Sequence, residues 1–180
     1  MTQILKYKEA ITYDALYKSM QTCKKNVQWK DSVANFTLHV IKNISALSEE
    51  LENGTYIQRE PYLFRITSPK PREILSVPFR DRVYQRSLND NILYPVMTKN
   101  FIYDNCACQI GKGNKFARER LVKQLHRMIN KYGVNLHVFQ IDVHAFYRSL
   151  KHEYIENLFR CKLDEETFFH VEKILKKQYQ

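Results

Sequence analysis

The spacing of apolar residues changes near residue 54, and this change constrains the fold more than any other feature of the sequence. Over residues 31–52, apolar side chains recur every three or four positions, which predicts an amphipathic helix capped by Asp31 and ended by Asn53-Gly54. Over residues 62–66, alternate side chains are apolar, which predicts a strand. A chain that holds both periods in separate segments is expected to adopt an α+β fold.

A β-hairpin is predicted over residues 62–77, because Pro69-Lys70-Pro71 favours a turn between two strand-like segments. Three cations lie around its tip: Arg65, Lys70 and Arg72. An arginine fork matches phosphate oxygens and a lysine adds a point charge, so these side chains suit a triphosphate. A hairpin whose cations are simply solvated is the alternative interpretation.

Helical spacing predicts most of the remaining elements, at residues 2–20, from 78–80 to about 96, 115–131, 151–160 and 164–178. The second of these helices opens on Arg80-Asp81-Arg82, for which a charged turn facing water is the simplest interpretation. The helix over 115–131 is expected to turn five apolar residues inward: Ala117, Leu121, Leu125, Met128 and Ile129. An irregular loop precedes it and contains Gly111-Lys112-Gly113, which lacks the pattern of a Walker phosphate-binding loop.

Asp142 stands at the end of an apolar segment, residues 136–143, that predicts a buried strand. A carboxylate there is costly unless it is paired, exposed or bound to a metal. Strand ends commonly carry functional sites, and two-metal phosphoryl transfer uses clustered carboxylates to hold Mg²⁺. An aspartate that caps the following turn is the alternative.

The net charge of +10, from 29 Lys plus Arg against 19 Asp plus Glu, favours a polyanionic partner. Nucleic acid is the commonest such partner, and an inert basic surface remains open. The four cysteines do not form a zinc framework, because a single C-x-C pair lacks a second pair. No apolar stretch is long enough to span a membrane and residues 1–9 do not resemble a signal peptide, so we expect a cytoplasmic protein.

The order and spacing of these motifs resemble those of prokaryotic reverse transcriptases over about residues 55–160. The matching features are Pro69-Lys70 with Arg72, the stretch Pro78–Gln85, Leu93-Tyr94-Pro95 with Phe101, the loop 107–113, and Asp142 followed by Phe146-Tyr147. The loop 101–113 is most similar to diversity-generating retroelement enzymes and then to group II intron enzymes. The resemblance implies fingers over residues 55–135 after an N-terminal helical segment, 1–54, and the start of a palm over 136–180.

The resemblance also implies roles for individual residues. Asp142 would be the first metal-binding aspartate, with the Val143 carbonyl beside it, and Mg²⁺ would be the cofactor. Tyr147 would be the steric gate against a ribose 2′-hydroxyl, while Arg65, Lys70 and Arg72 would hold the dNTP. RNA template and RNA–DNA hybrid would be the partners; the sequence does not indicate an oligomeric state.

Two departures from the family pattern limit the resemblance. The usual Lys-Lys-Phe-Phe-Pro-Ser is His144-Ala-Phe-Tyr-Arg-Ser149 here, and no Tyr-x-Asp-Asp occurs in the chain. The second metal-binding pair is therefore expected beyond residue 180, and residues 1–180 alone are expected to be inactive. The alternative function is a non-enzymatic RNA-binding module, such as a maturase-like or defence-associated relative, whose basic charge would be explained equally well.

Overall fold

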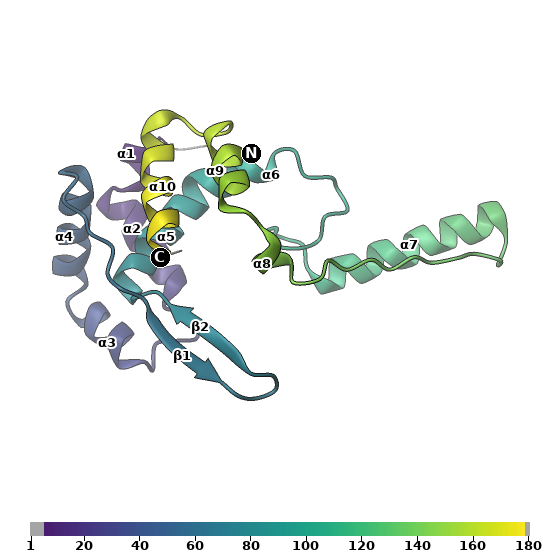
Figure 1. Ribbon diagram of the computed structural model, residues 1–180, viewed down its shortest axis with the longest axis horizontal. Helices are drawn as coiled ribbons and strands as arrows, with labels where there is room; N and C mark the ends of the chain where they lie inside the picture. Colours follow the sequence, from purple (N-terminus) through teal and green to yellow (C-terminus); the bar gives the residue numbers. More distant parts are fainter. Residues whose placement is uncertain (1–5, 179–180) are drawn as a thin grey trace. The chain divides into compact units, whose positions relative to one another are not determined.

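The computed structural model describes residues 6–178, and for residues 147, 148 and 178 it describes the backbone alone. The chain divides into two compact units, residues 1–96 with 156–180 and residues 97–155 (Figure 1). The resemblance implied a different division, into an N-terminal helical segment (1–54), fingers (55–135) and the start of a palm (136–180). The two units reflect packing alone, so this division by function stays a prediction. None of the helices within residues 6–178 is both long and apolar enough to cross a membrane.

Helices dominate the first unit, and one antiparallel hairpin is its sheet, in agreement with the predicted α+β class. Its elements in chain order are α1 (Tyr7–Ala10), α2 (Tyr13–Cys23), α3 (Asp31–Leu38), α4 (Val40–Glu52), β1 (Tyr62–Ile66), β2 (Arg72–Ser76), α5 (Phe79–Leu88), the π-helical turn η1 (Asn89–Leu93) and α10 (Glu165–Gln178). The second unit holds α7 (Asn114–Tyr132) and α8 (Phe146–Ser149). Two helices cross the boundaries between the units, α6 (Tyr94–Thr98) and α9 (His152–Arg160).

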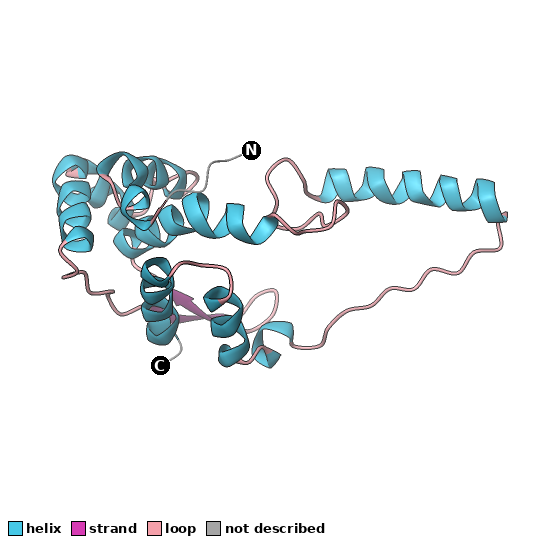
Figure 2. Ribbon diagram, turned by 90° about the horizontal axis from the view of Figure 1, so that it is seen from above, coloured by secondary structure: helices cyan, strands magenta, loops and turns pink. Residues whose placement is uncertain are grey.

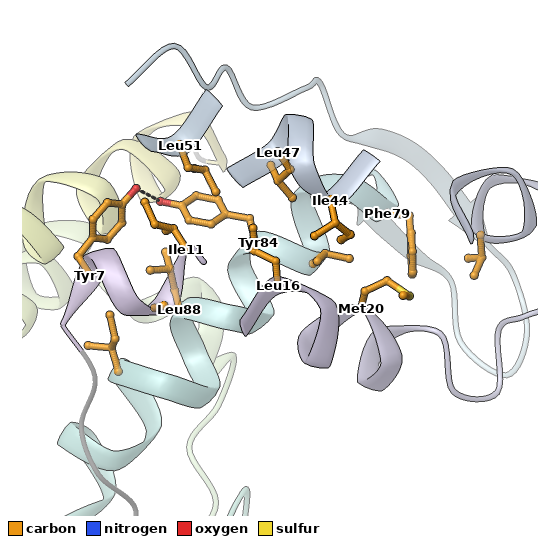
Figure 3. Packing of buried hydrophobic residues seen from close by; sticks show 14 residues of the cluster. Tyr7, Ile11, Leu16, Met20, Ile44, Leu47, Leu51, Phe79, Tyr84 and Leu88 are labelled. Atoms are coloured by element: carbon orange, nitrogen blue, oxygen red, sulfur yellow. Dashed lines mark hydrogen bonds between the residues drawn. The ribbon is translucent and has the colours of Figure 1, made fainter. Parts of the chain in front are cut away.

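The hydrophobic core of the first unit is formed where α1, α2, α4 and α5 pack together (Figure 3). Its central side chains are almost completely buried and come from all four helices and from Ile11, which follows α1: Tyr7, Ala10, Ile11, Leu16, Met20, Ile44, Leu47, Phe79, Val83, Tyr84 and Leu88. On α10, Val171 is also buried, and Ile174 packs against this core. Removal of this much apolar surface from water is the main stabilising contribution to the unit.

Two buried serines join the core helices to the end of α1. Ser87 of α5 donates a hydrogen bond of 2.6 Å to the Ala10 carbonyl, and Ser48 of α4 donates one of 2.8 Å to the Ile11 carbonyl. The last carbonyls of a helix lack partners within that helix, and leaving them buried and unpaired would be costly. The serines therefore allow the short helix α1 to end inside the protein.

The prediction of one helix over residues 31–52 is wrong, because the segment is broken at His39 into α3 and α4. His39 has φ −112° and ψ 38°, which is outside the helical range. The Asn43 side chain donates a hydrogen bond of 2.9 Å to the Phe36 carbonyl, which loses its helical partner at the break. Asp31 is the first residue of α3 rather than its cap, a position held by Lys30. The end at Asn53-Gly54 is confirmed, with Gly54 at φ +70°.

Helix α7 has the predicted extent and ends at Gly133, but the prediction that its apolar residues turn inward is wrong. No α7 residue is buried, and Leu121, Met128 and Ile129 are exposed. The helix forms because residues such as Arg, Lys, Leu and Gln have high helix propensity, not because it covers a core. Figure 2 shows it as one continuous rod.

The predicted buried strand over residues 136–143 is not formed. The segment is irregular, and Phe139 and Ile141 are each 89% exposed. A strand exists only when a neighbouring strand accepts and donates its backbone hydrogen bonds. Among the described residues, β1 and β2 pair with each other and not with this segment, so the expected start of a palm sheet is absent from residues 6–178.

Candidate functional site

The hairpin carries its three cations on exposed positions, as the pattern of strand and turn predicted. Arg65 lies opposite Glu73, whereas Arg72 lies opposite Ile66, and Lys70 is in the connecting turn. Because successive strand residues point to opposite faces, Arg65 and Arg72 are on opposite faces of the hairpin. The Arg65 face also carries the Glu73 carboxylate, so the face with Arg72 is the more favourable one for an anion.

The start of α5 does not face water, and the interpretation of Arg80-Asp81-Arg82 as a solvated turn is wrong. Asp81 is 0% exposed, and the Tyr56 hydroxyl donates a hydrogen bond of 2.6 Å to its Oδ1. Arg80 forms an ion pair with Glu50 of α4 and lies over the Tyr56 ring, 5.2 Å from its centroid. These contacts connect the beginning of α5, immediately after the hairpin, to the end of α4. They hold the base of the hairpin to the core of the first unit.

Burial and the adjacent Asp81 carboxylate both raise the pKa of the Tyr56 hydroxyl far above its usual value. Tyr56 therefore remains a hydrogen-bond donor at any physiological pH. The second oxygen of Asp81, Oδ2, is buried without a hydrogen-bond partner among the described residues. Burying a carboxylate with a single strong donor is costly, which makes the Tyr56 hydroxyl important for stability.

A second polar group joins α1, α5 and α10 in the same unit. The Tyr7 hydroxyl lies 3.2 Å from the Tyr84 hydroxyl (Figure 3) and 3.0 Å from Nδ1 of His170. The Tyr7 and His170 rings are stacked with centroids 3.8 Å apart. Burial lowers the pKa of His170 to about 4, with a further contribution from the Lys173 ammonium, so the imidazole is neutral at pH 7. Burial raises the pKa of Tyr7 to about 12, so its hydroxyl keeps its proton.

A cavity of about 270 Å³ adjoins this group, between α4, α10 and the segment that leads to the hairpin. Its walls include Leu51, Tyr56, Tyr84 and His170, and Lys173 also lines it. Gln58 lines it as well, and neither polar atom of the Gln58 amide has a partner among the described residues. None of these residues was predicted from the sequence as a site residue, because their proximity depends on packing between distant segments.

The loop that contains Gly111-Lys112-Gly113 is held to α7 by charged contacts. Arg120 donates two hydrogen bonds to Asp104, of 2.5 and 3.1 Å, and Gln124 donates one of 2.6 Å to the same carboxylate. The Arg120 guanidinium holds the pKa of Asp104 below its usual value. Lys112 donates to the Tyr103 carbonyl at 2.6 Å, so its ammonium stabilises the loop itself. Gly111 and Gly113, at φ +77° and +152°, allow the turns that a side chain would strain.

Asp142 and Val143 are both exposed and lie in an irregular segment rather than at the end of a strand. Within residues 6–178, no group of three His, Cys, Asp or Glu side chains is placed to hold a metal ion. The side chain of Tyr147, the expected steric gate, lies outside the described residues. The backbone of Tyr147 belongs to α8. This helix begins directly after Ala145, which has the left-handed conformation.

The predicted site residues therefore belong to two different units: Arg65, Lys70 and Arg72 to the first, and Asp142, Val143 and Tyr147 to the second. The hairpin offers an exposed cationic tip that suits phosphate oxygens. Asp142 offers an accessible carboxylate that suits a cation. Comparisons of the sequence with protein-family models and with curated proteins find no match.

Proposed function

We propose that the chain provides the fingers and the beginning of the palm of an RNA-directed DNA polymerase, which adds dNTPs to a primer on an RNA template. The observation that carries this proposal is an exposed cationic hairpin followed directly by the Arg80-Asp81-Arg82 start of α5. The glycine loop before α7 comes next, and Asp142 follows it. This is the order of motifs in the reverse transcriptases that the chain resembles. The net charge of +10 supports a nucleic-acid partner.

In this proposal, Asp142 and the Val143 carbonyl would contribute oxygen ligands to Mg²⁺, which stabilises the developing charge on the transferred phosphoryl group when bound. One carboxylate and one carbonyl are fewer ligands than two Mg²⁺ ions require from a protein. Residues 1–180 by themselves are therefore expected to bind substrates without extending a primer. The hairpin cations would neutralise and orient the triphosphate of the incoming nucleotide.

A non-enzymatic RNA-binding module is the second candidate function. It is favoured by helix α7, which is strongly basic and has no buried residue, because such a surface suits a polyanionic partner without any chemistry. The two functions share the nucleic-acid partner and differ in the nucleotide site at the hairpin. Binding of a dNTP in the presence of Mg²⁺ therefore separates them.

The experiment is a fluorescence titration of a labelled Mg–dNTP against the 180-residue chain and three single variants, Arg65→Gln, Lys70→Gln and Arg72→Gln. Loss of one charged hydrogen bond to phosphate should weaken binding about tenfold in Lys70→Gln and Arg72→Gln. Arg65→Gln should have a smaller effect, because Arg65 shares its face of the hairpin with Glu73. Equal affinities in all four proteins, or no binding by any of them, would contradict a nucleotide site on the hairpin.

A further inference from the structure

Helix α7 carries six cations and one acid over residues 114–132, and none of its side chains is buried. Three of the cations, Lys123, Arg127 and Lys131, recur every four residues. Residues at this spacing lie on one face of a helix, one turn apart. We call these three residues the α7 cation stripe.

The α7 cation stripe lines a groove of about 410 Å³ beside Asp104 and Arg120. Arg120 is neutralised by Asp104, but within residues 6–178 neither Lys123 nor Arg127 has an acidic partner. Lys131 lies over the Tyr132 ring, 4.7 Å from its centroid, and among the same residues it forms no ion pair with an acid. Like charges four residues apart destabilise a helix slightly, so a polyanion that neutralises all three would also stabilise α7.

The geometry of the stripe identifies the kind of polyanion. With a rise of about 1.5 Å per residue, the three cations are separated by about 6 Å along a straight axis, like a row of point charges. Such a row fits the regularly spaced phosphates of a nucleic-acid strand. Tyr132 is the one aromatic residue that lines the groove, and the Lys131 ammonium lies over its ring. The groove therefore offers a row of cations for phosphates but no series of rings on which unpaired bases could stack.

We propose that the α7 cation stripe binds the phosphate backbone of an RNA-containing duplex without sequence preference. This inference rests on the proposed nucleic-acid role and adds the surface that carries it. The Asp104–Arg120 pair fixes the glycine loop at the N-terminal half of the same helix. The duplex would therefore extend along α7 from that loop towards Tyr132.

The test compares two variants of the full chain that each lose three positive charges. The stripe variant is Lys123→Gln, Arg127→Gln and Lys131→Gln. The control variant replaces three exposed lysines of the first unit, on α2, in the turn after α2 and on α4: Lys18→Gln, Lys25→Gln and Lys42→Gln. Glutamine has a helix propensity similar to that of lysine and arginine, so circular dichroism should show unchanged helix content in both variants.

Binding of a labelled RNA–DNA hybrid of mixed sequence is measured by fluorescence anisotropy between about 50 and 200 mM salt. Each neutralised phosphate contributes about 0.9 to the slope of log affinity against log salt. The affinity of the stripe variant, which loses three contacts, should therefore fall about 40-fold less over this range than the affinity of the natural chain. The affinity of the control variant should fall nearly as much as that of the natural chain. A variant with Lys123→Arg and Lys131→Arg should bind like the natural chain.

Equal losses of affinity for the hybrid in the stripe and control variants would overturn the proposal that the stripe is the binding surface. The nucleic-acid role would stay in place, because binding would then follow net charge alone. Absence of hybrid binding by the natural chain would overturn both. The opposite side of α7 exposes Leu121 and Ile129, so vesicles of phosphatidylserine and phosphatidylcholine are tested in parallel. Stripe-dependent binding to vesicles, without binding to the hybrid, would assign the surface to a membrane and overturn the proposal.

Discussion

The neutral, half-buried His170 predicts that the first unit loses stability in mild acid. Its pKa is lowered from 6.5 to about 4 in the folded protein by burial and by Lys173. Well above pH 6.5, His170 is neutral in both the folded and the unfolded chain and does not change the free energy of unfolding. As the pH falls below 6.5, the unfolded chain binds a proton that the folded protein does not, so the free energy of unfolding decreases.

The magnitude follows from the shift in pKa. One pKa unit corresponds to about 1.4 kcal/mol of unfolding free energy. At about pH 5, most of the loss that His170 can cause has developed. After a reduction for the partial exposure of the ring, we expect a loss of about 1 to 2 kcal/mol between about pH 7.5 and pH 5. The Asp164 carboxyl does not contribute in this window, because the hydrogen bonds from Thr167 outweigh burial and keep its pKa below its usual value.

The assay is urea unfolding of the natural chain and of His170→Phe at both pH values, followed by circular dichroism. Phenylalanine keeps a ring to stack on Tyr7, whose hydroxyl still lies beside that of Tyr84. The difference in stability between the two pH values should shrink by about 1 to 2 kcal/mol in His170→Phe. His126→Gln, which changes an exposed histidine of α7, should leave the difference unchanged. The same loss in all three proteins would refute the assignment to His170.

Two further substitutions test the contacts that hold the first unit together. Tyr56→Phe removes the hydrogen bond from Tyr56 to the buried Asp81 carboxylate. It should lower the free energy of unfolding by about 2 to 3 kcal/mol in urea unfolding, whereas Tyr62→Phe on the exposed hairpin should change it by less than about 0.5 kcal/mol. Ser87→Ala leaves the Ala10 carbonyl without its partner and should cost about 1 to 2 kcal/mol; stability equal to that of the natural chain would mean that water replaces the serine.

The elements that the sequence predicted well depend on local interactions. The hairpin was expected at residues 62–77 because alternation and the Pro69-Lys70-Pro71 turn are both visible within a few residues, and β1 and β2 form there. The ends of the helices at Gly54 and Gly133 follow from the positive φ that glycine tolerates. The exposure of Lys70 and its neighbours at the tip follows from the same local pattern.

The elements that the sequence predicted badly depend on contacts between distant segments. Asp81 is buried because Tyr56, 25 residues earlier, supplies its hydrogen bond. The Tyr7–His170 pair joins residues 163 positions apart. Residues 136–143 have the composition of a strand, but a strand also needs a partner, and composition does not specify one. For the same reason, an apolar stripe on α7 did not imply that another element covers it.

The measurement that tests the central claim most directly is primer extension on an RNA template by the complete product of the gene, with Mg²⁺ and dNTPs. The account predicts incorporation by the natural protein and a loss of at least about 100-fold in Asp142→Asn, because asparagine removes a charged metal ligand. Binding of the RNA–DNA hybrid should be retained in that variant, since the phosphates are contacted by cations elsewhere. Incorporation that survives Asp142→Asn, or hybrid binding by the natural protein without any incorporation, would contradict the assignment as a polymerase.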